Sequence, residues 1–253
     1  MIRRLCAAGL LACAACSGTA ADWRLEAGLQ AHTLEETSPS GARLVRESGV
    51  APVLGVALHH RLAEHWALAG RLSGWHSRAD YDGRTQAGQP VASRTATGAL
   101  GLESRLVWQP AAWRAEAGVQ WEVFDRRIQG TAGALGLDER LQQGRLDLGA
   151  GWQRGPWDGV LRLTWGDRGR LRVRFDGAAF DDAHLRSGTA RGVGLELSRR
   201  LAPGWRARLS LERLDVGASQ AAALARAGLP FGSVAQPTWR RERAVLTLER
   251  RFD

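Results

Sequence analysis

The sequence lacks lysine and asparagine altogether, and it contains only two isoleucines and one tyrosine. Codons for lysine, asparagine and isoleucine are rich in A and T, so a GC-rich genome explains their scarcity. All 35 basic residues are therefore arginines for a reason that is independent of function. The isoelectric point of 11.1 is accordingly weak evidence for a nucleic-acid partner.

Long apolar segments are also missing. No run of about 20 apolar residues follows the N-terminal segment, which excludes a protein that crosses a membrane with helices. With 44% hydrophobic and 24% charged residues, the chain is too apolar to be intrinsically disordered. Its 253 residues allow one large all-β unit or two small domains.

Cysteine is confined to the first 16 residues, within a segment that resembles a secretory signal peptide. Two arginines near the N-terminus precede an apolar stretch that ends at Ala15, and small residues follow up to Ala21. We expect cleavage after Ala21, which leaves residues 22–253 as a mature chain without cysteine. The alternative is a lipoprotein signal, in which Cys13 follows Leu-Leu-Ala and carries a lipid.

The remainder of the chain repeats one pattern of about ten residues in which apolar and polar side chains alternate. Alternation with a period of two is typical of strands that have two different faces. In the segment that starts at Trp157, Leu161 and Leu163 share one face, whereas Arg162 and Thr164 share the other. The ten strands predicted in this way cover residues 23–34, 51–62, 66–77, 94–108, 113–127, 140–153, 157–175, 189–200, 205–216 and 238–252.

The connections between these segments alternate in length. Short ones follow the second, fourth, sixth and eighth strands, and longer polar or glycine-rich ones follow the others. Tryptophans flank the short turns, where indole rings would form a girdle at a membrane interface. These tryptophans are Trp66, Trp108, Trp113, Trp152, Trp157 and Trp205, and Trp23 begins the first strand on the same side.

An even number of antiparallel strands with this turn pattern resembles the bacterial outer-membrane β-barrels. The resemblance extends over residues 22–253 and implies an all-β fold, a ten-stranded antiparallel transmembrane β-barrel with short periplasmic turns and long extracellular loops. It also implies location in the bacterial outer membrane, contact with outer-membrane lipids and lipopolysaccharide, and insertion by the barrel-assembly machinery. That machinery reads an amphipathic final strand with a terminal aromatic, here Phe252, although Arg250 and Asp253 depart from the pattern.

The polar face of the strands predicts a closed lumen. Barrels of about eight strands are just wide enough for side chains to fill, whereas aqueous channels need about sixteen. We therefore expect ion pairs to plug the interior and the protein to have a structural or surface-interaction role. The predicted inward residues are Arg24, Glu26, Gln30, His32, His59, Arg61, Arg71, Glu103, Arg105, Arg114, Glu116, Glu122, Arg145, Asp147, Arg162, Glu196, Arg206, Arg208, Glu212 and Glu249.

Two further segments carry expectations of their own. The strand over 157–175 is longer than a membrane requires, and its arginines from Arg168 to Arg174 continue the parity of Arg162. Part of it should stand outside the membrane as a solvated face, with lipopolysaccharide phosphates as alternative partners. The alanine-rich stretch 219–228 predicts a short helix that ends at Gly228.

A ten-stranded barrel also resembles the omptin family of outer-membrane proteases, which use an Asp-Asp pair and an Asp-His pair to activate water. The matching residues are Asp80 and Asp82, after the third strand, and Asp182 and His184, after the seventh. An omptin-like aspartyl endopeptidase is therefore the alternative function.

Other chemistry has less support in the sequence. A further alternative, a lipid A-modifying barrel, would use His76 and Ser77. No zinc-ligand spacing, P-loop or serine-hydrolase elbow occurs, so we expect no metal and no cofactor. The signal segment and the acids interleaved with the arginines argue against a nucleic-acid partner.

Overall fold

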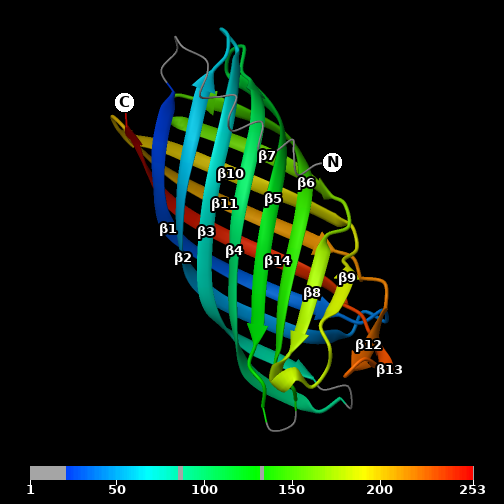
Figure 1. Cartoon of the computed structure of the whole chain (residues 1–253). Helices are drawn as coiled ribbons and strands as arrows, with labels where there is room; N and C mark the ends of the chain where they lie inside the picture. Colours follow the sequence, from blue (N-terminus) through cyan, green and yellow to red (C-terminus); the bar gives the residue numbers. More distant parts are fainter. Residues whose placement is uncertain (1–20, 85–87, 132–133, 253) are drawn as a thin grey trace.

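Ten long antiparallel strands form a closed barrel in the computed structural model, which describes residues 21–84, 88–131 and 134–252 (Figure 1). Residues 1–20 of the predicted signal segment, which covers residues 1–21, lie outside the described residues, and so does Asp253. Among the residues described, no helix has the length and hydropathy needed to cross a membrane. The ring consists of β1 (Asp22–Thr37), β2 (Arg43–Arg61), β3 (Trp66–Arg84), β4 (Pro90–Trp108), β5 (Trp113–Ile128), β6 (Leu137–Arg154), β7 (Trp157–Gly166), β10 (Ala190–Ala202), β11 (Trp205–Val216) and β14 (Thr238–Phe252).

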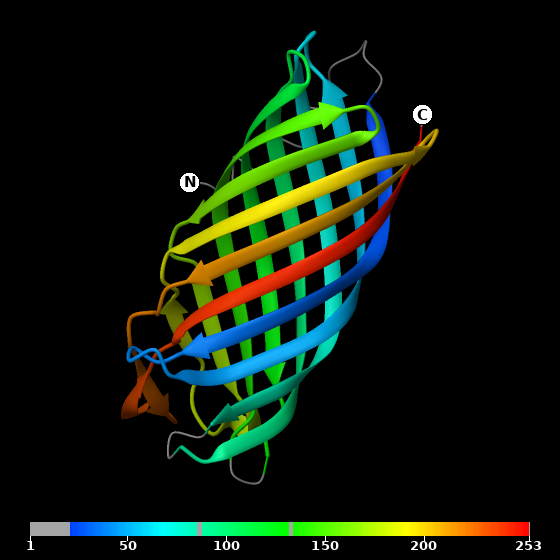
Figure 2. The same cartoon turned by 180° about the vertical axis from the view of Figure 1, so that it is seen from behind.

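The first and last strands of the ring meet along their whole length. Figure 2 shows β1, in blue, between β2 and the red β14. Their register runs from Trp23 opposite Phe252 to Thr37 opposite Thr238. Closure pairs the backbone N–H and C=O groups of both strands, as a sheet surrounded by hydrocarbon requires. The predicted ten-stranded antiparallel barrel is confirmed.

The connections define two different ends of the barrel. At the short-turn end, residues 62–65, 109–112, 155–156 and 203–204 join consecutive strands. The opposite end, which we call the long-loop end, carries β8, β9 and the hairpin of β12 and β13 (Figure 1). On that side β2 begins at Arg43, earlier than predicted, so the first connection shrinks to residues 38–42.

The predicted strand over 157–175 is interrupted, and the two parts face different ways. β7 ends at Gly166, and β8 (Arg170–Phe175) pairs with β6 and with β9 (Ala183–Arg186). Leu163 is exposed on the outer wall, whereas Leu171 is buried inside. The break contains three residues, and it shifts the alternation of inward and outward side chains by one position. The prediction that odd-numbered residues face the same side throughout 157–175 is therefore wrong. Arg170, Arg172 and Arg174 consequently face outward and are exposed.

The alanine-rich stretch forms a β-hairpin, not the predicted helix. β12 (Ala222–Arg226) pairs with β13 (Leu229–Val234) across a two-residue turn. Ala227 and Gly228 both have positive φ, 51° and 76°, as the tight turn of a two-residue hairpin demands. The Gly228 N–H donates a hydrogen bond of 2.9 Å to the Asp181 carboxylate, which holds the turn against the loop before β9.

The outer wall carries an apolar belt and an aromatic girdle. All seven tryptophans predicted for the girdle are exposed on the outer face, with Trp113 71% exposed. Beyond them, leucines and valines cover the wall, and Leu163 and Leu209 are 46% and 38% exposed. Charged residues such as Glu35 and Arg46 follow toward the long-loop end. A belt this apolar is stable only where hydrocarbon covers it.

The belt predicts the effect of placing a charge on it. Leu163→Arg should lower the free energy of unfolding by about 2–4 kcal/mol, because a guanidinium near the middle of the bilayer loses its hydration. Leu163→Met, a control that keeps the volume and the apolar surface, should cost less than about 1 kcal/mol. Urea unfolding of both variants in phospholipid vesicles measures the difference. Equal stability of the two variants would show that Leu163 does not face lipid.

Candidate functional site

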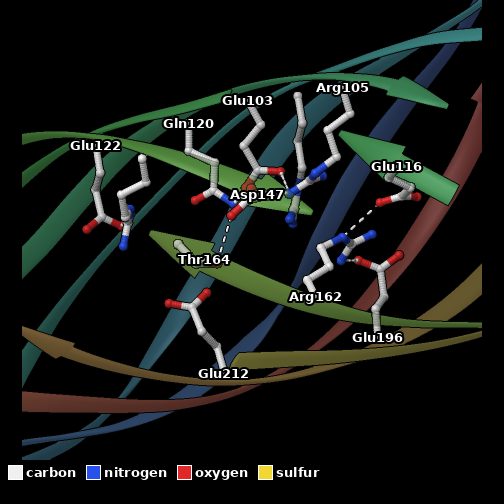
Figure 3. A network of polar contacts seen from close by, with 12 residues as sticks. Glu103, Arg105, Glu116, Gln120, Glu122, Asp147, Arg162, Thr164, Glu196 and Glu212 are labelled. Atoms are coloured by element: carbon white, nitrogen blue, oxygen red, sulfur yellow. Dashed lines mark hydrogen bonds and ion pairs between the residues drawn. The ribbon is translucent and has the colours of Figure 1, made fainter. Parts of the chain in front are cut away.

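Buried ion pairs fill the middle of the lumen. The Arg162 guanidinium of β7 lies between Glu116 of β5 and Glu196 of β10, and it donates a hydrogen bond of 2.9 Å to each (Figure 3). Because β5 and β7 are not neighbours in the ring, this arginine connects strands that share no backbone hydrogen bonds. The expected pairing of inward charges is confirmed at this layer.

Neighbouring groups extend the network in both directions. The Thr164 hydroxyl donates to Asp147 at 2.7 Å, and Gln120 donates to the same carboxylate (Figure 3). The free volume at this level is a cavity of about 90 Å³, which holds a few water molecules. Further pairs in the lumen join Arg71 and Arg208 to Glu26, Arg208 to Glu249, Arg145 and Arg241 to Glu122, and Arg243 to Glu212.

An apolar layer closes the lumen on the long-loop side of these ion pairs. Trp239 of β14 is 2% exposed and stacks on Phe124 of β5, with ring centroids 6.1 Å apart. Trp75 of β3 also contacts Phe124, with ring centroids 6.2 Å apart. The remaining buried members come from β1, β6, β8, β9, β10 and β11: Leu34, Leu141, Leu171, Val173, Ala183, Leu185, Ala190, Leu214 and Val216.

A buried arginine with three carboxylates borders the apolar layer toward the long-loop end, where Arg126 follows Phe124 by two residues along β5. Arg126 donates to Glu47 at 2.9 Å, to Glu139 at 2.8 Å and to Glu36. The Thr95 hydroxyl also donates to Glu47, at 2.9 Å. Each carboxylate thus has the buried guanidinium as a partner of opposite charge, which offsets the cost of burying these groups.

The predicted Asp-Asp pair lies on the outer face of β3. Asp80 and Asp82 are exposed, and the alternation of the strand turns Tyr81 between them toward the interior. Asp82 forms an ion pair of 3.3 Å with Arg43 of β2. These carboxylates therefore point away from the lumen.

The predicted Asp-His pair is exposed near the start of β9. Asp182 accepts a hydrogen bond of 2.6 Å from Arg172, which lowers the pKa of Asp182. His184 lies opposite Arg172 in the register of β8 and β9 and is also exposed. β3 pairs with β2 and β4, whereas β9 pairs with β8. The two predicted pairs therefore lie on strands that are not neighbours in the sheet. The catalytic role of these four residues stays a prediction.

His76 and Ser77 point to opposite faces of β3, as consecutive strand residues must. His76 is exposed, whereas Ser77 is buried and its hydroxyl donates to the Val50 carbonyl at 3.1 Å. The two side chains therefore do not form the pair that a lipid A-modifying site would need. Within the described residues, no group of three or more His, Cys, Asp or Glu side chains is placed to bind a metal.

The sequence interpretation missed the charges and aromatics beyond the mid-lumen layer. Arg126, Glu36 and Glu47 share the inward parity of their strands, and so does Trp239. For Glu36 and Glu47, the signal that could have found them is the same alternation, continued past the predicted strand ends. Arg126 and Trp239 already lie inside the predicted strands 113–127 and 238–252, on the parity of the inward Glu122 and Glu249. Arg61, which was predicted to point inward, is exposed and donates to carbonyls of the adjacent short turn.

No protein-family model matches the chain. No curated protein matches it either. The outer membrane protease OmpT from Escherichia coli matches over 94% of this chain and 99% of its own, with a TM-score of 0.57 and 11% identity. The translocator domain of the autotransporter NalP from Neisseria meningitidis covers 100% of this chain and 95% of its own, with a TM-score of 0.48 and 14% identity.

An outer membrane channel from Pseudomonas putida F1 covers 94% of this chain and 97% of its own, with a TM-score of 0.46 and 9% identity. Identities this low establish the fold alone. The chain has the fold of the bacterial outer-membrane β-barrels, with buried charges inside.

Proposed function

We propose that this protein is a closed barrel of the bacterial outer membrane with a structural or surface-interaction role, and that it is not a diffusion channel. The observation that carries the proposal is that two separate layers of side chains fill the lumen. Arg162 and its carboxylate partners occupy the middle, and the layer around Trp239 and Phe124 occupies the long-loop side. A hydrated ion would have to displace both layers to pass.

The orientation follows from the class of fold. In outer-membrane barrels the short turns face the periplasm and the longer loops face outward. The long-loop end, with β8, β9 and the hairpin of β12 and β13, would then be the part that partners at the cell surface meet. Residues 1–21 would be removed as a signal peptide, with lipidation at Cys13 as the alternative.

Lipopolysaccharide is the proposed neighbour of the outer wall above the apolar belt. Arg170 and Arg186 face outward and lie directly opposite each other in the register of β8 and β9. Like charges in this position repel each other, and a bound anion would reduce that repulsion. Phosphate groups bind guanidinium through paired charge-assisted hydrogen bonds. Arg78, Arg94 and Arg191 add exposed positive charge at the same end of the barrel.

The barrel-assembly machinery is the proposed partner of β14.

Conductance tests the proposal. The purified protein, inserted into a planar lipid bilayer, should give no stepwise ion current at any voltage that the bilayer withstands, because both layers block the lumen. A channel-forming outer-membrane protein in the same apparatus is the positive control. Regular conductance steps from this protein would contradict a closed barrel.

The alternative function is an omptin-like aspartyl endopeptidase with Asp80, Asp82, Asp182 and His184 as its site. Its support is the match to the OmpT protease over nearly the whole chain. Under the structural proposal, the purified protein cleaves no basic peptide between about pH 5 and pH 8. Cleavage that disappears in His184→Ala but persists in His65→Ala, a control histidine exposed at a short turn, would establish the alternative.

A further inference from the structure

We propose that the short-turn end of the lumen is a binding site for a small molecule with two negative charges, carried by phosphate or carboxylate groups. A cavity of about 240 Å³ lies there, between the mid-lumen ion pairs and the short-turn opening. We call it the vestibule. Its rim is formed by the inward side chains of Arg24, His59, Arg114, Asp158 and Arg206.

The lining of the vestibule carries an excess of positive charge, because it includes seven arginines and five carboxylates. On the floor, Glu26 lies 2.7 Å from Arg71 and 2.8 Å from Arg208, so each charge has a close partner. At the rim, Arg24 and Arg206 have only longer contacts, of 3.6 Å and 3.5 Å, with carboxylates. These two guanidiniums can therefore accept negative charge without displacing a tight ion pair.

The rim arginines also keep unused hydrogen-bonding capacity. Arg24 lies 3.6 Å from Glu249, and Arg206 lies 3.5 Å from Asp158, which are longer contacts than those on the floor. Arg114 contacts Glu116, but its Nε has no hydrogen-bond partner. A guanidinium presents its donors in a planar fork that matches the two oxygens of a phosphate or carboxylate. The rim thus offers donors as well as charge.

Access and size define the class of ligand. The side chains of Arg24, Arg114 and Arg206 are 22%, 21% and 27% exposed, so solvent reaches them from the short-turn end. The cavity volume suits a compact dianion and is too small for a lipid or a folded peptide. The proposed function closes the lumen beyond Arg162, and on that basis a molecule that enters must leave by the same opening. The vestibule is therefore a blind receptor site, independent of whether the long-loop end binds partners.

Calorimetric titration of the folded barrel in a non-ionic detergent tests the proposal, with inorganic pyrophosphate and succinate as separate probes. At least one probe should bind saturably with a stoichiometry of one, more weakly at higher salt, and the stronger probe identifies the preferred anionic group. Acetate, with one charge, should bind at least about tenfold more weakly. Absence of saturable binding by both dianions would overturn the proposal.

The variants locate the site. Arg114→Gln combined with Arg206→Gln should weaken binding by at least about tenfold, because two charge-assisted contacts are lost. Arg199→Gln is the matched control: Arg199 lies near the same end but on the outer wall, over the Trp157 ring at 5.1 Å, and binding should be unchanged. If the double variant does not fold, the single variants Arg24→Gln and Arg206→Gln replace it, with an expected loss of about threefold each. Unchanged affinity in the folded rim variants would place the anion elsewhere and refute the vestibule.

Discussion

Replacing Arg126 with methionine should lower the free energy of unfolding by about 3–5 kcal/mol. The arginine is the shared partner of Glu36, Glu47 and Glu139, and its side chain is 2% exposed. Methionine fills much of the same volume, so the loss comes mainly from three carboxylates left facing one another without a cation. Removing one partner of a buried ionic group costs far more than the group contributes when it is complete.

The loss should shrink as the pH falls. Without the arginine, Glu36, Glu47 and Glu139 lie close together in a buried position with no cation, so burial and mutual repulsion both favour their protonated forms. The folded variant therefore binds protons more tightly than its unfolded chain does. A group whose pKa is raised by folding stabilises the folded state at low pH, and that stability is lost as the pH rises through the folded pKa. The variant should accordingly be more stable near pH 5 than near pH 8.

Arg127→Met provides the matched control, since Arg127 is the next residue but faces outward. Its side chain is 69% exposed, and its ion pair with Asp138 is 3.3 Å long. A solvated pair of this kind contributes less than about 1 kcal/mol. Urea titrations of both variants at the two pH values measure the contrast. Equal losses at the two positions would show that Arg126 is not the centre of a buried cluster.

The barrel could be predicted from sequence because membrane strands alternate so strictly. Where hydrocarbon covers one face, each outward position must be apolar, and Leu161, Leu163 and Leu209 obey that requirement. Short turns and girdle tryptophans then fixed the number and direction of the strands. The rule weakens above the belt, where water surrounds the outer wall and the outward residues become charged.

The break between β7 and β8 illustrates that limit. Leu171 and Val173 keep the parity of Leu161 and Leu163, so the parity of the apolar residues does not mark a change of face, although Gly166, Asp167 and Gly169 interrupt the alternation. The structure inserts three residues outside the ladder, and the Gly169 N–H donates to the Ser187 hydroxyl at 2.8 Å. Leu171 thereby turns inward, although it has the parity of the outward Leu163. A hydrogen bond between segments 18 residues apart is invisible to a period-two pattern.

The candidate site was harder to predict for a related reason. Asp80 and Asp82 share a strand face, as the spacing requires, but the spacing does not say which face. The belt fixes it: Leu72 on the same strand is exposed with the even-numbered residues, so the aspartates also face outward. Inward polar residues at the long-loop end, such as Glu47, were overlooked because the predicted strand began later than the real one.

Trp239→Ala should also be among the most damaging substitutions, with a loss of about 3–5 kcal/mol. The indole is 2% exposed inside the lumen and stacks on Phe124. The surrounding wall is a closed sheet whose strands are fixed by hydrogen bonds to both neighbours, so it cannot collapse into the space that the alanine leaves. The cost therefore includes both the lost contacts and an unfilled cavity.

Trp165→Ala is the corresponding change on the outer wall, where Trp165 is 43% exposed. Lipid chains are fluid and fill the space that the smaller side chain leaves, so this variant should lose much less stability than Trp239→Ala. Urea unfolding of the two variants in the same vesicles measures the contrast. The Trp239→Ala variant should still give no ion current, because Arg162 and its partners close the lumen independently of the apolar layer. If it conducted steadily, the aromatic layer would be the only barrier, and the ion pairs would line a path instead of blocking it.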